Sequence, residues 1–340
     1  MARSARIDLS RITQGITQAA MQHGQRLTEH LMASQALSRR SAVALLRQLV
    51  ELQWLQAGGT PQQPLYTPGA LRQVVQRYAL EGLQEDLPWR RDFAPCFALP
   101  APLLRMVQHA FTELLNNAIE HSGGSSVTVS MRQTPLQLQL LVSDDGCGLF
   151  HRIAQTFHIT DPHLALLELS KGKLSSAPAR HSGQGLYFTA RLADVLDLHA
   201  NHAAFQRRAW DAPRWHSGRA AAHTGTSVYL AIALDTPRTL DEVLRSCSLT
   251  GSDYALQRTE VPLQLLSQGE ALASRAQARR AVARLSQFAR AEIDFAGIQD
   301  LGPGFADEMF RVFANTHPEV ELVPVGMVPR VAQMVAGVLS

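Results

Sequence analysis

Three polar residues stand at four-residue intervals in a segment with apolar residues at helical spacing. They are Glu113, Asn117 and His121. Four residues are close to one helical turn, so the three side chains follow one stripe of a helix. Mg²⁺ prefers oxygen ligands and keeps several waters, which an asparagine oxygen and phosphate groups together satisfy. A carboxylate one turn away can orient or deprotonate an attacking water. The stripe therefore indicates a polar site, with a solvated helix face as the alternative.

A zinc site built from the same stripe is excluded by distance. Glu113 and His121 lie two turns apart, which is about 12 Å by helical rise. One zinc ion cannot bridge that separation, so this pair does not predict a transition-metal centre.

A carboxylate and two glycines follow a predicted strand. Residues 136–142 alternate and then become apolar, which is typical of a strand, and the chain continues as Asp144-Asp145-Gly146-Cys147-Gly148. A carboxylate at a strand end can accept a hydrogen bond from an exocyclic amine, and glycines allow close approach to a flat ring. Because Asp-Gly is also a strong turn signal, a plain turn is the alternative.

A second glycine pair precedes a predicted helix. Gly183-Gln184-Gly185-Leu186 leads into apolar residues at helical spacing, and glycine-rich backbone at a helix N-terminus offers N–H groups to phosphates. Further along, Gly225-Thr226 precedes an apolar strand over 228–234.

Taken in order, these segments resemble the N, G1 and G2 boxes of the GHKL superfamily of ATP-binding domains. That superfamily includes gyrase-type and chaperone ATPases, histidine kinases and anti-sigma-factor kinases. The resemblance implies ATP and Mg²⁺ as ligands, with Glu113 as the catalytic residue, Asn117 as the metal ligand and Asp144 reading the adenine amino group. The other residues that it places at the nucleotide are His121, Gly146, Gly148, Gly183, Gly185, Leu186 and, near the adenine, Thr226.

The lysines of the chain have an unusual placement. Of 32 basic residues only Lys171 and Lys173 are lysines, and both fall between the G1 and G2 boxes, where the family has its mobile ATP lid. A compact ammonium group on a flexible stem suits phosphate contact. We therefore expect one of them to close on the γ-phosphate, with a solvated loop as the alternative.

Positive charge gathers at the start of the chain. The formal net charge is only +3, yet the first 78 residues hold nine arginines against Asp8, Glu29 and Glu51. A basic cluster of this kind is the electrostatic footprint of a nucleic-acid binder. The remainder is slightly acidic, so only the N-terminal part is expected to bind nucleic acid.

The same N-terminal part resembles a winged helix-turn-helix. A short helix over 26–38 leads through a turn, with Ser38 as N-cap, to a longer helix, and residues 54–67 look like two short strands around a tip. The resemblance covers residues 1–68 and implies duplex DNA as a partner. Arg39, Arg40 and Arg47 would then face DNA; dimerisation or partner docking is the alternative.

Two further segments complete the organisation of the chain. Residues 69–92 are expected to form a helical linker, with a connecting helix over 71–83, and a strand near 93–97 is expected to begin an ATP-binding domain that ends at 236. From 237 to 340, strands and helices alternate, which indicates an α/β layer.

The C-terminal segment resembles the STAS-like domains of the DUF4325 family. Relatives of these domains, the anti-sigma-factor antagonists, are partners or phosphoacceptors of GHKL kinases, so the resemblance implies a protein partner. Their phosphorylatable loop corresponds here to Gly302-Pro303-Gly304, which has no hydroxyl. Because phosphoryl transfer needs an acceptor oxygen, self-phosphorylation there is not expected. His109 and His121 belong to the ATP-domain helix, so no phosphoacceptor helix of a sensor kinase is expected either.

Together these features predict an α/β multidomain protein with a winged helix-turn-helix, a Bergerat-type α/β sandwich and a STAS-like domain. No apolar run approaches membrane-spanning length and no signal peptide opens the chain, so a cytoplasmic protein without membrane contact is expected. The main hypothesis is an ATP switch with slow hydrolysis, in which domain or homodimer geometry controls DNA binding. The alternatives are an anti-sigma-type serine/threonine kinase and a partner-binding protein with structural ATP.

Overall fold

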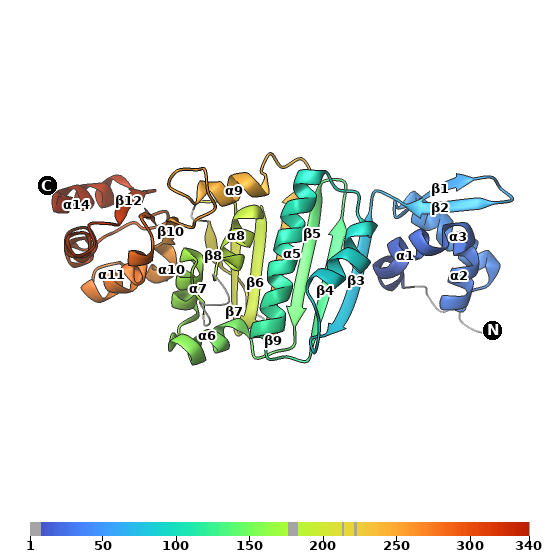
Figure 1. Ribbon diagram of the computed structural model, residues 1–340, viewed down its shortest axis with the longest axis horizontal. Coiled ribbons are helices and arrows are strands. Elements are labelled where there is room, and N and C mark those ends of the chain that lie inside the picture. Colours follow the sequence, from blue (N-terminus) through green and yellow to red (C-terminus); the bar gives the residue numbers. More distant parts are fainter. Residues whose placement is uncertain (1–7, 176–182, 213, 221–222, 340) are drawn as a thin grey trace.

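The computed structural model of the chain describes residues 8–175, 183–212, 214–220 and 223–339. Three groups of elements follow one another along its long axis: N-terminal helices with a hairpin, a large central sheet, and a small α/β layer (Figure 1). One hydrophobic core runs through the central and C-terminal parts, and a separate core fills the N-terminal part. The predicted α/β multidomain fold is confirmed.

The N-terminal part consists of helices packed beside a two-stranded antiparallel hairpin. Its elements are α1 (Leu9–His23), η1 (Gly24–Arg26), α2 (Leu27–Ser34), α3 (Arg39–Glu51), β1 (Leu55–Gly59) and β2 (Pro64–Pro68). The Ser38 hydroxyl accepts a hydrogen bond from the Ser41 N–H at 3.1 Å, so the predicted N-cap of α3 is confirmed. The predicted helices and hairpin are present, while their identification as a winged helix-turn-helix stays a prediction.

The central part is a seven-stranded antiparallel sheet of order β3-β4-β5-β9-β6-β7-β8. Its strands are β3 (Arg72–Ala79), β4 (Ser126–Gln133), β5 (Gln137–Asp144), β6 (Val195–Asn201), β7 (Ala203–Arg208), β8 (Trp215–Ser217) and β9 (His223–Ala233). Along β4 and β5, every second side chain is buried, as the two-residue period of a strand requires. The buried side chains lie under a layer of helices.

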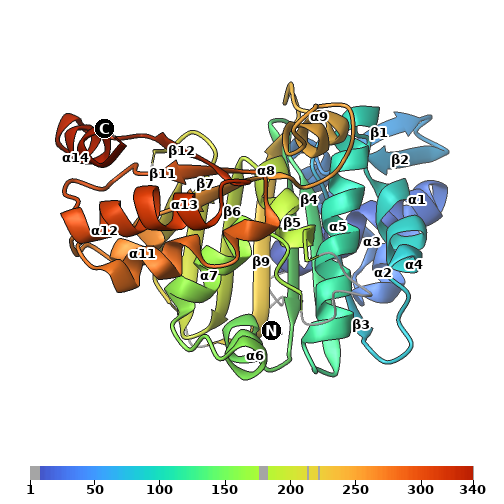
Figure 2. The same cartoon turned by 60° about the vertical axis from the view of Figure 1, so that its left-hand side comes forward.

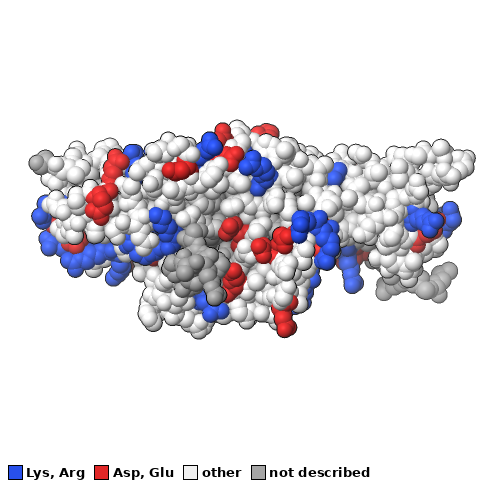
Figure 3. Space-filling model, viewed as in Figure 1, with Lys and Arg blue, Asp and Glu red and all other residues white. Residues whose placement is uncertain are grey.

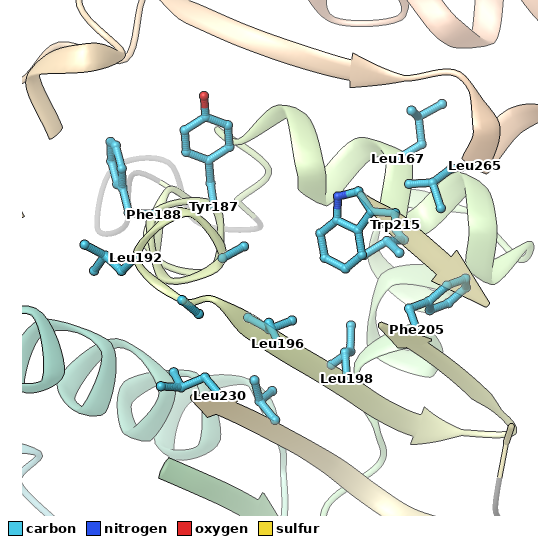
Figure 4. Close-up of a cluster of buried hydrophobic side chains, with 14 of the residues drawn as sticks. Leu167, Tyr187, Phe188, Leu192, Leu196, Leu198, Phe205, Trp215, Leu230 and Leu265 are labelled. Carbon is cyan, nitrogen blue, oxygen red and sulfur yellow. The ribbon is translucent and has the colours of Figure 1, made fainter. Parts of the chain in front are cut away.

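The helices of the central part vary in length. They are α4 (Asp86–Pro88), η2 (Trp89–Phe93), η3 (Ala94–Cys96), α5 (Ala101–His121), α6 (Leu149–Phe157), α7 (Pro162–Lys171), α8 (Gly185–Leu192) and α9 (Leu240–Ser246). Figure 1 shows α5 lying along the sheet, and Figure 4 shows Leu192 of α8 in one buried cluster with Leu196 and Leu230 of the strands. These contacts fix the position of α5, which carries the N box, and of α8, which follows the G2 box.

Two secondary-structure predictions at the start of the central part are wrong. Residues 72–79 form β3, whose N–H and C=O groups pair with β4, and not a connecting helix. Valines and a tyrosine in this segment favour a strand. The predicted strand near 93–97 is instead the end of η2 followed by η3, because Trp89 and Phe93, one turn apart, both pack on the ring of Phe111 at 5.2 and 5.1 Å.

The N-terminal part is attached to the free edge of this sheet through α1. The hydroxyl of Thr17, which is fully buried, accepts a hydrogen bond from the Gln73 N–H of β3 at 3.0 Å. The Gln18 side chain donates to the Asp92 carbonyl at 3.2 Å. Helix α1 therefore covers an edge strand whose backbone groups would otherwise face water.

The C-terminal part contains a three-stranded parallel sheet of order β10-β11-β12. Its elements are β10 (Arg258–Pro262), α10 (Gln264–Ser267), α11 (Arg275–Val282), η4 (Leu285–Gln287), β11 (Arg290–Asp294), α12 (Pro303–Asp307), η5 (Glu308–Phe313), α13 (Ala314–Thr316), β12 (Glu321–Val325) and α14 (Pro329–Leu339). The predicted α/β layer is confirmed. Strand β10 ends at Pro262, and a helical turn follows it. Figure 2 shows the C-terminal helices beside α7 of the central part.

Within the described residues, no helix is both long enough and apolar enough to cross a membrane.

Candidate functional site

A cavity of about 360 Å³ lies between α5, the end of β5, α6 and the start of α8. Its size falls in the range of small-molecule binding sites. Its lining is mixed and contains both carboxylate and amide side chains and aliphatic ones. The predicted site residues that line it are Glu113, Asn117, His121, Asp144, Gly148, Gly183, Gly185, Leu186 and Thr226.

Helix α5 supplies the polar stripe predicted from the sequence. Glu113, Asn117 and His121 all line the cavity, together with Asn116 and Glu120. The opposite face of α5 is buried in the core, so the helix cannot rotate without exposing it. The four-residue spacing has therefore placed a carboxylate, an amide and an imidazole along one wall.

Asp144 lies at the end of β5 and is almost completely buried, with 7% of its surface exposed. Its Oδ1 accepts hydrogen bonds from the Gly146 N–H at 2.9 Å and the Thr226 N–H at 3.2 Å. Two backbone donors on one oxygen fix the orientation of the carboxylate at the cavity wall. The Thr226 hydroxyl in turn accepts the Leu149 N–H at 2.9 Å, which ties β9 to the start of α6.

Gly146 is not among the described residues that line the cavity, and its role is in packing. A Cβ atom there would lie 2.2 Å from the Ser122 carbonyl oxygen, so the G1 turn packs directly on the end of α5. We therefore place Gly146 beneath the cavity wall and Gly148 in the wall itself. Direct contact of Gly146 with a nucleotide stays a prediction.

The start of α8 faces the α5 stripe at very close range. A Cβ atom on Gly185 would lie 2.0 Å from the Glu113 Oε2, so only glycine fits at this position. The first N–H groups of a helix have no intrahelical partner and attract anions. His181 and Ser182, which precede this glycine segment, lie outside the described residues.

The neighbouring carboxylate, Asp145, stabilises a loop. It accepts four hydrogen bonds, from the N–H and hydroxyl groups of Ser125 and Ser126, at 2.7 to 2.9 Å. These bonds, those of Ser126 foremost, hold the pKa of Asp145 well below its ordinary value. Two adjacent aspartates thus have different environments, one at the cavity and one at the loop before β4.

Asp145 should contribute stability that disappears in acid. A carboxyl group whose pKa is depressed by folding stabilises the protein above its unfolded pKa, near 3.9, and less as the pH falls below it. The loss of unfolding free energy caused by Asp145→Asn should therefore shrink between about pH 6 and pH 3. Urea denaturation of both proteins across that range measures it. A destabilisation that stays constant over the range would contradict this role.

Both lysines of the expected lid have other partners and neither lines the cavity, so the structure does not show the predicted phosphate contact. The Lys171 Nζ lies 2.6 Å from the Glu168 Oε1 and 2.9 Å from the Ala283 carbonyl oxygen, and its side chain is fully buried. The Lys173 Nζ donates to the Gln287 carbonyl at 2.6 Å. Both ammonium groups therefore bind the C-terminal part of the chain, because that part packs on α7.

Sequence reasoning missed Arg152, which lines the cavity from α6. Its Nε donates to the His121 carbonyl at 2.8 Å, so it is anchored at the end of the polar stripe. Among the described lining residues it is the only lysine or arginine. Its signal in the sequence is weak, because arginine is common in this chain and nothing local marks a position four residues after Gly148.

The three arginines predicted to face DNA lie on α3 and are exposed. Arg39 and Arg40 form its first turn and Arg47 lies about two turns further on. None of the three forms an ion pair with a described residue. Figure 3 shows basic side chains at both ends of the molecule, but in the C-terminal part Arg275 and Arg279 are paired with carboxylates at 3.1 and 2.6 Å.

Two segments of the chain match known protein families. Residues 77–204 match the histidine kinase-like ATPase domain, and residues 277–332 match the STAS-like domain of unknown function (DUF4325). The chain therefore contains a GHKL-type ATP-binding domain followed by a STAS-like domain. The first match begins inside β3 and spans Glu113, Asn117, Asp144 and both glycine segments. No curated protein matches the chain.

Proposed function

We propose that this protein is an ATP-dependent switch that hydrolyses ATP slowly with Mg²⁺ and controls the contact of its N-terminal part with DNA. The observation that carries the ATP site is the convergence of Glu113, Asn117, Asp144 and the start of α8 on one cavity of about 360 Å³. The family match of residues 77–204 supports the same ligand.

Different residues of the cavity bind different parts of the nucleotide. The anchored carboxylate of Asp144 accepts a hydrogen bond from the adenine amino group, and aliphatic side chains such as Val142 and Leu198 flank the ring. The N–H groups at the start of α8 bind phosphate oxygens. Arg152 adds the positive charge that the lysines do not supply. Glu113 orients the water that attacks the γ-phosphate and accepts its proton.

The donor set also fits Mg²⁺. Asn117 lines the cavity one turn from Glu113, and a site with one protein oxygen leaves positions for phosphate oxygens and waters. When bound, the ion would neutralise charge that develops on the phosphate oxygens. Asn117 is the residue that would hold it.

The alternative is a kinase that phosphorylates a separate protein. The presence of a STAS-like domain favours it, and the loop at Gly302 to Gly304 offers no hydroxyl, so the acceptor would lie on another chain. A time course with γ-labelled ATP and Mg²⁺, with and without cell extract, separates the two. Release of label as free phosphate supports the switch, whereas transfer of label to a protein band supports the kinase. Neither signal rising above background would contradict both functions.

DNA binding by the N-terminal part should depend on its arginines, because their charges neutralise backbone phosphates. Replacing Arg39, Arg40 and Arg47 by alanine should weaken binding across all sequences. It should also reduce the slope of log K against log salt concentration by roughly one for each phosphate that is no longer neutralised. Fluorescence anisotropy with duplex DNA between about 50 and 200 mM salt measures this.

A matched control for that experiment is Arg90→Ala. Arg90 is exposed and pairs with Asp86 at 2.5 Å, outside the N-terminal part, so the variant removes a positive charge without touching α3. Unchanged salt dependence in the triple variant would show that α3 does not bind DNA, and would favour dimerisation or partner docking.

A further inference from the structure

The STAS-like domain holds the segment that leads into the ATP cavity. Helix α7 ends at Lys171, which contacts the end of α11 in the STAS-like domain, and α7 also packs on α10. Both views show α7 beside α11 (Figures 1 and 2). We propose that Glu168, Lys171 and Arg284, here called the clasp, position the cavity wall so that the STAS-like domain sets the affinity for ATP. This inference rests on the proposed ATP site.

The clasp is a chain of ionic contacts around a buried lysine, and its Glu168–Arg284 pair crosses the domain boundary. The Glu168 carboxylate binds the Lys171 Nζ at 2.6 Å through one oxygen and the Arg284 guanidinium at 3.0 Å through the other. Arg284 also donates to the Lys173 carbonyl at 2.6 Å. The Thr259 hydroxyl donates to the Lys171 carbonyl at 2.7 Å, so the backbone at the end of α7 is held as well.

The surroundings of Lys171 are built to keep a charge in the protein interior. Burial lowers the pKa of its ammonium group, and Glu168 opposes that effect. The Ala283 carbonyl at the C-terminal end of α11 accepts a hydrogen bond from this ammonium group, and a helix C-terminus favours a cation. A fully buried lysine is costly unless paired and hydrogen-bonded. Leu167 of α7 and Leu265 of α10 lie side by side and also join the two domains (Figure 4). Such an apolar contact has no comparable cost, so holding the domains together does not by itself require a buried lysine.

Backbone strain at the same place points to a constrained geometry. Lys173 and Arg284 have φ values of +57° and +64°, in the left-handed region that non-glycine residues rarely adopt. Such strain persists only where surrounding contacts impose it. The two strained residues are joined by the hydrogen bond from Arg284 to the Lys173 carbonyl.

The clasp connects directly to the cavity. Leu174 and Ser175, the next residues after Lys173, line it. A Cβ atom on Gly183 would lie 2.4 Å from the Leu174 carbonyl oxygen, so the held segment packs on the first glycine of the phosphate-binding turn. Any movement of the clasp therefore moves the part of the wall that Leu174 and Ser175 form.

The test uses the full-length protein with Arg284→Gln and Lys171→Met. Each change removes one cation and leaves Glu168 with the other, which limits the cost of an unpaired buried charge. Calorimetric titration with Mg²⁺ and a non-hydrolysable ATP analogue, well below the unfolding temperature, should show about tenfold weaker binding for both variants. In turnover assays KM should rise while kcat stays near the wild-type value, because Glu113 is untouched.

The control is Arg311→Gln, which removes an exposed arginine that pairs with Asp307 inside the STAS-like domain. It should bind the analogue as wild type does. Hydrogen exchange adds a second readout: the analogue should slow exchange over 280–288 in wild type but not in Arg284→Gln. If Arg284→Gln shows wild-type affinity and exchange, the proposed role of the clasp is overturned while the ATP site stands. If Arg284→Gln does not fold, the same result in Lys171→Met leads to the same conclusion. Absence of binding by the wild type would overturn the ATP site as well.

Discussion

Replacing Asp144 by asparagine is expected to weaken ATP binding by roughly 100-fold, or about 3 kcal/mol, with the fold intact. An asparagine Oδ1 can still accept the N–H groups of Gly146 and Thr226, which lie 2.9 and 3.2 Å from the carboxylate oxygen. The other position then carries an NH₂ group in place of an acceptor. This NH₂ group and the adenine amino group are both hydrogen-bond donors. One buried hydrogen bond is therefore lost, and two donors face each other in its place.

The adjacent carboxylate provides the control for this experiment. Asp145→Asn removes the same charge one residue away, but Asp145 binds Ser125 and Ser126 and does not line the cavity. Calorimetry with a non-hydrolysable ATP analogue should therefore show near wild-type affinity for Asp145→Asn. Circular dichroism checks that both variants fold. If Asp144→Asn binds within about threefold of wild type, Asp144 does not read the adenine.

The parts of the site that the sequence predicted are those set by short-range periodicity. Glu113, Asn117 and His121 share a wall because an α-helix repeats every 3.6 residues, and that spacing does not depend on the rest of the fold. The glycine at 185 was predictable for a similar reason, since a helix N-terminus near phosphate needs close backbone approach. Gly146 shows the limit of this reasoning, because its neighbour is the Ser122 carbonyl, which no local pattern reveals.

The parts that could not be predicted depend on contacts between segments far apart in the chain. Residues 72–79 form a strand because β4, some fifty residues later, offers a free edge, and α1 covers the other side. Tertiary pairing of this kind overrides weak local preference. Trp89 and Phe93 form a helical turn for the same reason, because both rings pack on Phe111.

The two lysines illustrate how a sequence can mark a position without showing its contacts. Their isolation in the lid region did indicate a special position, but their partners are the Ala283 and Gln287 carbonyls of the other domain. A sequence shows that an ammonium group needs a partner, whereas only the fold shows which partner is nearest. Arg152 was overlooked for a related reason. Its anchor is the His121 carbonyl, and a sequence does not show which backbone carbonyl will accept a hydrogen bond.

Replacing Glu113 by alanine is expected to leave ATP binding within about threefold of wild type while turnover falls by roughly 100- to 10,000-fold, the usual contribution of a general base. The carboxylate faces the start of α8, where a Cβ atom on Gly185 would lie 2.0 Å from its Oε2, so it lies beside the expected phosphate position. It is distinct from Asp144, which we propose binds the adenine end of the nucleotide. Loss of the base should therefore affect the chemical step and not recognition.

Single-turnover release of labelled phosphate, with binding measured separately by calorimetry, distinguishes these two effects. Gln108→Ala is the control, because Gln108 is exposed on the same helix and lies outside the cavity lining. It should hydrolyse ATP at the wild-type rate. If Glu113→Ala also does so, the attacking water is oriented by another group, and Glu120, the second carboxylate that α5 contributes to the wall, becomes the next residue to test. If binding and turnover fall together, Glu113 acts in nucleotide recognition, and the switch needs a different route for resetting its state.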